Sequence, residues 1–335
     1  MKHYLLILIV FTLCLFYTCE SILIEDNHND NNLLDFQETW EIVDSIYPFF
    51  ELKKINWDSL YYIYRDKAIE AKGDEIFEVL YNLLNELKDG HVRIGTQGGE
   101  YIHTFIPERT IKDRGTFNPV VTRNYFSSEL KVDKNKKLEY EITNSNVGYI
   151  RIATFYKSGW TEIDMYNAIK YMINTKGLII DVRNNIGGSY ILVNMIVKRL
   201  INEPVLDLPV RKNDKWFPRN FINPSDDIQY NNPVIILVNG VCYSATEQFI
   251  AIIEQAKHVI LIGDTTGGGS SAPKKFTLTS GKEIYTSTHE ICRSDSVAIE
   301  FNGIVPDIRI VNTLNEIENN IDRQLEFAIN YLNKN

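Results

Sequence analysis

One serine stands where an acyl-transfer nucleophile would be placed. The run Val234 to Val238 is apolar and strand-like, the turn signal Asn239-Gly240 follows it, and a helical pattern begins at Ser244. A serine at a strand-to-helix turn exposes its hydroxyl beside unpaired N–H groups, and the helix dipole there favours negative charge. Because serine is also a common helix N-cap, this position alone does not distinguish a nucleophile from a cap.

Three further segments carry residues suited to the same chemistry, namely Leu87 to His91 (LKDGH), Gly177 to Gly188 (GLIIDVRNNIGG) and Glu300 to Asp307 (EFNGIVPD). The histidine and carboxylate types in these segments suit serine chemistry, because a neutral imidazole can take a serine proton and return it to a leaving amine and a carboxylate can support the site. A glycine turn after a strand presents N–H groups to an oxyanion. Taken alone, His91 is also explained as a residue just past a helix C-cap glycine.

The elements that would position these residues follow an α/β pattern from residue 147 to the end of the chain. Strand-like runs cover residues 147–155, 177–183, 234–238 and 258–263, and helical patterns cover residues 161–173, 190–200 and 244–254. Continuous apolar strands separated by helices predict a sheet with helices on its faces. Residues 276–279 and 283–286 predict a hairpin, and residues 315–332 predict a closing amphipathic helix.

The chain before this core has a different pattern. Apolar residues recur at helical spacing over residues 36–87, with one helix begun near Asn56, and predict a small helical unit of residues 36–91. Residues 92–146 contain one alternating run, 137–142, and are predicted to form an irregular connector with short strands.

The segments LKDGH, GYIRIATF, GLIIDVRNNIGG, VNGVCYSATEQF, LIGDTTGG and GIVPD, in this order, resemble the C-terminal processing peptidase family of serine proteases. The resemblance covers residues 36–332. It implies an α/β fold with a ClpP/crotonase-like core and a small N-terminal helical bundle. It also implies Ser244 as the nucleophile, with oxyanion donors at Gly187 or Gly188 and at the Ala245 N–H. The implied substrates are peptides or unfolded protein segments.

Two active-site designs exist within that family. In the processing-protease branch the general base is a lysine in a segment like TFGKG, but Gly269 occupies the matching position in this chain. Lys274 and Lys275 lie several residues out of register. That branch usually also carries a PDZ domain, for which residues 92–146 are too few.

The other branch resembles the tricorn core protease, in which a histidine from the N-terminal helical unit is the base. His91 matches that histidine and Glu300 matches the acidic residue of the branch. The tricorn member has a serine immediately before the histidine, whereas this chain has Gly90. The resemblance therefore implies a serine peptidase of the tricorn-like type, with one departure beside the base.

Two functions of other classes share this core fold, and fold alone does not separate them. The first is a non-catalytic module that binds peptides or hydrophobic ligands. The presence of Ser244, His91 and Glu300 together counts against it, while Gly90 keeps it open. The second is a crotonase-like acyl-CoA enzyme. The export that the N-terminus indicates argues against this function, because CoA substrates are intracellular.

The N-terminus indicates export. Lys2 and His3 precede an apolar stretch from Tyr4 to Phe16, which is too short to span a bilayer and is typical of a secretory signal over residues 1–18. Cys19 follows as in a bacterial lipobox, and residues 19–35 would then form a polar tether. We therefore expect a protein of the bacterial cell envelope anchored by a lipid on Cys19; a signal cleaved elsewhere, without lipid, is the alternative.

Composition limits the remaining possibilities. The chain has 335 residues, 44% hydrophobic and 24% charged, with a net charge of -9 and no Lys/Arg cluster, which argues against nucleic acid as a partner. No Cys/His spacing is typical of a metal site and no Lys-Ser/Thr follows the glycine turn, so no cofactor is expected. Asp181 and Arg183 are expected to form an internal ion pair. Export permits a disulfide between Cys242 and Cys292 but does not require one.

Overall fold

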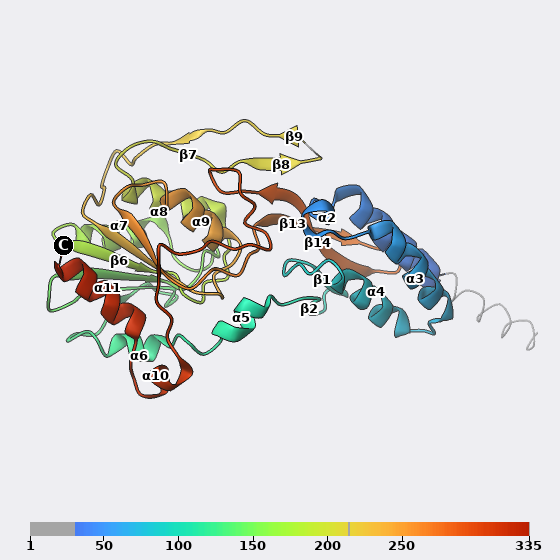
Figure 1. Cartoon of the computed structure of the whole chain (residues 1–335), viewed down its shortest axis with the longest axis horizontal. Coiled ribbons are helices and arrows are strands. Elements are labelled where there is room, and N and C mark those ends of the chain that lie inside the picture. The colour runs from blue at the N-terminus through green and yellow to red at the C-terminus, as the bar shows by residue number, and fades with distance from the viewer. Residues whose placement is uncertain (1–30, 214, 335) are drawn as a thin grey trace, which may run out of the picture. The chain divides into compact units, whose positions relative to one another are not determined.

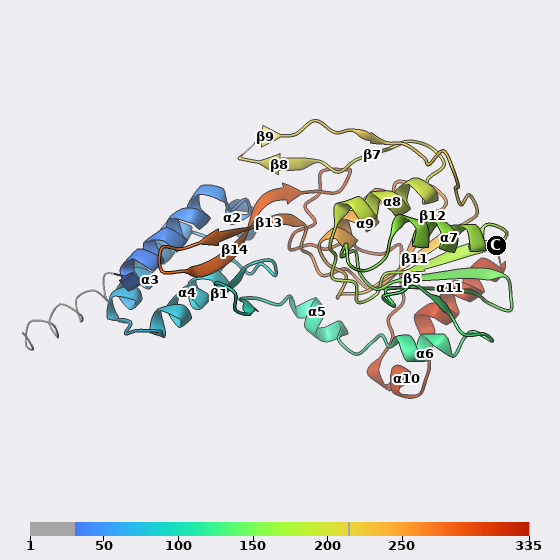
Figure 2. The same ribbon diagram turned by 180° about the vertical axis from the view of Figure 1, so that it is seen from behind.

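The computed structural model describes residues 31–213 and 215–334, which divide into two compact units (Figures 1 and 2). Of the described residues, unit 1 contains those up to Phe105 together with Pro273–Thr288, and unit 2 contains those from Ile106 to Ala272 and from His289 onward. The predicted signal, Cys19 and most of the predicted tether lie outside the described residues. Within residues 31–213 and 215–334, no helix has the length and apolar character needed to cross a membrane.

Unit 2 is built on a seven-stranded sheet. Its strands lie in the order β15 (Ile308–Arg309), β12 (Val259–Gly263), β11 (Val234–Val238), β6 (Gly177–Asp181), β5 (Val147–Ile152), β4 (Leu138–Ile142) and β3 (Lys131–Val132). The strands from β15 to β5 are parallel, and β4 and β3 are antiparallel additions. In the centre of the sheet Ile236 lies opposite Ile180 and Leu261, so the buried strands form the continuous apolar layer that their sequences predict.

Helices cover both faces of this sheet, because alternate residues of each strand point to opposite sides. Ile180 and Ile236 pack with α7 (Glu162–Met172), α8 (Tyr190–Leu200) and α9 (Ala245–Ile253) in one cluster. Ile179 and Ile235 pack with α11 (Arg323–Lys334) in another cluster. Figures 1 and 2 show α11 across the sheet from the other three helices. The predicted α/β core is therefore observed.

Unit 1 combines helices with a small sheet. Residues 31–46 are helical and are followed by α2 (Phe50–Lys53), α3 (Trp57–Glu70) and α4 (Glu75–Asn85). Asn56 caps α3 by accepting the N–H of Ser59 at 3.0 Å, as a helix begun near Asn56 requires. The strands β1 (Arg93–Thr96), β2 (Tyr101–His103), β13 (Ser271–Thr277) and β14 (Lys282–Ile291) pair beside these helices.

The remaining elements of the described chain are short. They are α5 (Glu108–Asp113), α6 (Pro119–Arg123), β7 (Val205–Leu206), β8 (Val210–Lys212), β9 (Lys215–Trp216), β10 (Phe221–Ile222) and α10 (Leu314–Glu318). β8 pairs with the end of β14 through Arg211 opposite Glu290.

Two segments differ from their predicted assignment. The predicted hairpin forms as β13 and β14, but residues 273–288 cluster with unit 1 and not with the core, because Tyr285 pairs with Arg93 of β1. Residues 315–332 were predicted as one helix, and the structure breaks them into α10 and α11. The break occurs because Asp322 is buried, where it accepts the N–H of Leu325 at 3.2 Å and caps α11.

Smaller differences concern the ends of the predicted units and the cysteines. Residues 31–35, which were assigned to the polar tether, already belong to the first helix of unit 1. In the predicted connector, β1 and β2 belong to unit 1 and β3 and β4 to the sheet of unit 2. Cys242 and Cys292 are both buried as free thiols, so no disulfide links them.

Candidate active site

Ser244 lies at the strand-to-helix turn that its sequence context predicts. It follows β11 and is the N-cap of α9, with φ 58° and ψ -125°. A positive φ is uncommon for a residue with a side chain, and such backbone strain is concentrated at functional sites. The residue is half-buried at the first turn of the helix, where the unpaired N–H groups of a helix N-terminus favour an anion.

The glycine turn after β6 packs directly against Ser244. Gly187 has φ 97°, and a Cβ atom on it would lie 2.8 Å from the backbone N of Ala245 and 2.9 Å from Cβ of Ser244. Gly188 has φ 141°, and a Cβ there would lie 2.2 Å from the carbonyl carbon of Phe155. Only glycine fits at these two positions.

The N–H groups of this region differ in their partners. The Gly187 N–H donates to Oδ1 of Asn185 at 2.9 Å, so it is already used inside the turn. Across the part of the chain that the structure describes, no acceptor is found for the N–H groups of Gly188 and Ala245. Two unpaired donors next to a strained serine are what an oxyanion site requires.

Glu247 is a buried acid beneath the serine, and it was not among the predicted site residues. One oxygen accepts the N–H of Gly268 at 2.8 Å and the hydroxyl of Thr266, and the other accepts the N–H of Gly269 at 2.7 Å and of Ser244 at 3.3 Å. Its carboxylate therefore ties the first turn of α9 to the loop 266–269. The sequence Ser-x-x-Glu is a capping-box signature, so the contact of Glu247 with the Ser244 N–H could have been found from the sequence, but its contacts with the loop 266–269 could not.

Replacing Glu247 with glutamine is expected to lower stability and turnover together. An amide oxygen can replace only one of the two carboxylate oxygens. The N–H groups that face the position of the second oxygen lose their acceptor, which costs about 1–3 kcal/mol of folding free energy for each group. Thermal unfolding and peptide hydrolysis would measure both effects. Glu254→Gln, at the C-cap of the same helix and paired with Arg293, is the control that should leave turnover near wild type.

Position 269, which matches the lysine of the processing-protease branch, has no room for a side chain in this structure. A Cβ atom on Gly269 would lie 1.8 Å from Cζ of Tyr243, so the tyrosine ring fills the space that a side chain at 269 would need. Lys275 pairs with Glu283 at 2.9 Å, and Lys274 lies over the ring of Phe276. Both lysines belong to unit 1, as parts of the hairpin.

Glu300 lies in unit 2 on a segment fixed to the same loop. Its side chain is buried, and the next residue, Phe301, donates its N–H to the carbonyl of Gly268 at 2.9 Å. Arg109 of α5 donates to the carbonyls of Thr266 at 3.0 Å and of Phe301 at 2.6 Å. Arg109, which had no predicted role, therefore holds the loop 266–269 and the Glu300 segment together.

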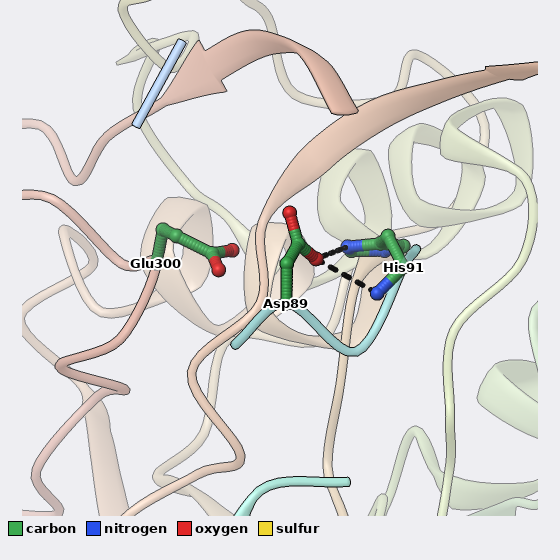
Figure 3. A group of neighbouring side chains, drawn as sticks. All are labelled: Asp89, His91 and Glu300. Atoms are coloured by element: carbon green, nitrogen blue, oxygen red, sulfur yellow. Dashed lines mark hydrogen bonds and ion pairs between the residues drawn. The ribbon is translucent and has the colours of Figure 1, made fainter. Parts of the chain in front are cut away.

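His91 lies in unit 1, in the turn between α4 and β1. Only 7% of the residue is exposed. Burial lowers the pKa of His91 to about 4; the charge of Asp89 opposes this shift, and the charges of Arg93, Lys53 and His103 add to it. The imidazole is therefore neutral at physiological pH, which is the state a general base needs. Figure 3 shows His91 beside Asp89.

The structure thus brings most of the predicted site residues together within unit 2. Ser244, Ala245, Gly187 and Gly188 form one turn region, and the Glu300 segment is bonded to the adjoining loop. His91 is carried by unit 1. The expected ion pair between Asp181 and Arg183 is confirmed at 2.6 Å, with both side chains fully buried.

Comparison with known proteins finds similarity to peptidases. The profile of peptidase family S41 matches residues 146–310, and that of the tricorn protease C1 domain matches residues 31–85. The carboxy-terminal processing protease CtpB of Bacillus subtilis is 28% identical over 176 residues, 51% of this chain and 35% of the relative. The tricorn protease of Thermoplasma volcanium is 27% identical over 261 residues, 77% of this chain and 24% of the relative. This chain therefore spans well under half the length of these two relatives.

A solved structure extends the likeness to almost the whole chain. A crystal structure from Parabacteroides merdae, of a candidate peptidase, superposes with a TM-score of 0.80 at 27% identity and covers 90% of this chain and 96% of its own. The predicted ClpP/crotonase-like α/β fold with an N-terminal helical region is confirmed.

Proposed function

This chain belongs to peptidase family S41, a family of serine-type peptidases, and on that premise we propose that it hydrolyses peptide bonds in peptides or unfolded protein segments. Ser244 is the nucleophile, His91 the general base and Glu300 a supporting carboxylate. The observation that carries the proposal is the backbone of Ser244, which holds a serine at positive φ on the first turn of α9 beside unpaired N–H groups.

The proposed reaction uses each group in turn. Oγ of Ser244 attacks the scissile carbonyl carbon while Nε2 of His91 takes the hydroxyl proton. The N–H groups of Gly188 and Ala245 stabilise the oxyanion; the engaged Gly187 N–H is the weaker of the two glycine candidates. The imidazolium then protonates the leaving amine as the C–N bond breaks, and water, deprotonated by the same imidazole, hydrolyses the acyl ester.

An activity-based label tests the proposal. The full chain treated with a fluorophosphonate should gain the mass of one adduct, and Ser244→Ala and His91→Ala should gain none. Because His91 becomes protonated near pH 4, labelling should stay constant above about pH 5 and fall below it. Absence of an adduct on folded wild-type protein would contradict hydrolysis and favour a binding module.

We also propose that the protein is exported and anchored to the bacterial envelope through a lipid on Cys19. The support is the sequence of residues 1–19, in which a short apolar stretch ends at a cysteine. Metabolic labelling with a fatty acid should mark the wild-type chain and leave Cys19→Ala unlabelled. An unlabelled wild-type chain would contradict the lipid anchor.

A further inference from the structure

Asp89 and His91 occupy the turn that joins α4 to β1. Oδ1 of Asp89 accepts the backbone N–H of His91 at 2.8 Å, and the same oxygen lies 3.7 Å from Nδ1 of the imidazole (Figure 3). The carbonyl of Asp89 accepts the N–H of Val92 at 3.1 Å, so the backbone of the turn is fixed as well. The acid and the imidazole therefore have a set relative position within unit 1.

The other carboxylate oxygen of Asp89 is also held. Oδ2 accepts the hydroxyl of Ser287, on β14, at 2.7 Å, and no part of Asp89 is exposed. An aspartate that only supports a turn needs one oxygen for a nearby N–H, and it commonly lies at the surface. A fully buried carboxylate with both oxygens engaged beside an imidazole requires a further explanation.

The charge of Asp89 supplies that explanation. Burial raises the pKa of Asp89, but the charges of Lys53 and His91 and the bonds from Ser287 and the His91 N–H outweigh it, so that the pKa is lowered overall. The carboxylate is then an anion at neutral pH. A buried anion is costly unless donors and positive charge surround it. At 3.7 Å, longer than a hydrogen bond, a proton on Nδ1 would face the carboxylate and be favoured by its charge.

We propose that Asp89 is the positioning residue of His91, holding the proton on Nδ1 so that Nε2 carries the lone pair that acts as base. This inference rests on the proposed function, in which His91 is that base. Gly90, where the tricorn relative has serine, offers no side chain, and Asp89 one residue earlier provides the orienting contact, while Glu300 remains the supporting carboxylate.

The tautomer of His91 tests this directly. In the full chain with ¹⁵N-labelled histidine, the His91 signals are assigned by their loss in His91→Ala. At pH 7 the wild type should show a protonated Nδ1 and an unprotonated Nε2. In Asp89→Asn the amide N–H can donate to Nδ1, so the two nitrogens should exchange character. The titration midpoint of His91 should also move down, because Asp89 raises it.

Kinetics provide the second measurement. Asp89→Asn should lower kcat by about 10²- to 10⁴-fold with little change in KM, since a base in the wrong tautomer cannot take the serine proton. Asp89→Glu should recover part of the loss. The matched control is Asp35→Asn, which removes a buried acid of the same unit that pairs with Lys282 at 2.8 Å. It should lower the unfolding temperature while leaving kcat and the His91 tautomer unchanged.

The possible outcomes distinguish a failure of this inference from a failure of the proposed function. A wild-type His91 protonated on Nε2 would overturn the inference. This measurement needs no variant, so the inference can be tested even if Asp89→Asn does not fold. If Asp89→Asn keeps the normal His91 tautomer and normal kinetics while His91→Ala is inactive, the inference is overturned and the proposed function stands. The same holds if the His91 tautomer changes in Glu300→Gln and not in Asp89→Asn. Full activity in His91→Ala would overturn the proposed base itself.

Discussion

Replacing Ser244 with alanine is expected to lower kcat by about 10⁴- to 10⁶-fold and to leave the protein folded. The substitution removes only the hydroxyl, and the backbone carbonyl of Ser244 still accepts the N–H groups of Glu247 at 2.8 Å and of Gln248 at 3.1 Å, which begin α9. Hydrolysis of an unfolded protein substrate, measured beside the circular dichroism and unfolding temperature of the same samples, would check both parts. Activity within tenfold of wild type would show that Ser244 is not the nucleophile.

A second variant at the same position tests whether the serine is strained. Ser244→Gly also lacks the hydroxyl, but glycine adopts φ 58° without steric cost. We therefore expect it to be as inactive as Ser244→Ala and more stable by about 1 kcal/mol, in the range of other relieved positive-φ positions. A glycine variant less stable than the alanine variant would contradict strain at this turn.

The same experiment separates a histidine base from a lysine base. His91→Ala should lose activity on the scale of Ser244→Ala, while Lys274→Ala and Lys275→Ala should be close to wild type. The Tyr243 ring occupies the space of a side chain at 269, and Lys275 is engaged with Glu283. An active His91→Ala with a strong loss at either lysine would restore the Ser/Lys mechanism.

The sequence predicted the core of unit 2 well because its signals are local. The runs that form β6, β11 and β12 are continuously apolar, and helical spacing marks α7 and α8 between them. Thr161 and Ser244 indicated the starts of two helices, because Ser and Thr are preferred N-cap residues. The position of Ser244 relative to β11 and α9 followed from those patterns alone.

The parts that sequence patterns missed depend on contacts between distant segments. The hairpin of β13 and β14 joined unit 1 because it pairs with β1, about 190 positions earlier in the chain, and no local pattern encodes a partner at that distance. Glu247 became part of the site only because the loop 266–269 folds onto α9. Asp89 was visible in the motif LKDGH, but its burial against Ser287 was not.

The second large effect is expected on folding, at Arg183. This side chain is fully buried at the end of β6, where it donates to Asp181 at 2.6 Å and to Asp322 at 2.7 and 2.8 Å. Asp322 immediately precedes α11 and accepts the N–H of Leu325, so the cluster joins the end of β6, next to the glycine turn of the candidate site, to the C-terminal helix. Arg183→Met keeps the apolar stem but leaves two buried carboxylates without a cation. We expect a loss of about 3–5 kcal/mol in the free energy of unfolding.

Denaturant unfolding measures this loss, and Arg309→Met is its control. Arg309 also pairs with an aspartate, Asp264 at 2.9 Å, but its side chain is 61% exposed, so its removal should cost at most about 1 kcal/mol. Equal losses in the two variants would contradict the distinction between a buried and an exposed ion pair.

Acid should reduce the difference between wild type and Arg183→Met. Burial raises the pKa of Asp322, but Arg183 and the bonds from Asn312 and Leu325 lower it to about 2, below the ordinary value of 3.8. A group with a depressed pKa stabilises the fold above its unfolded pKa, and that contribution is lost as the pH falls from about 4 to 2. In Arg183→Met the carboxylates lack the cation and protonate more readily, so acid relieves their repulsion. The difference in stability between wild type and Arg183→Met should therefore be largest near neutral pH and should shrink by about 2 kcal/mol at pH 2. A difference that stays constant with pH would show that Asp322 does not depend on Arg183 for its charge.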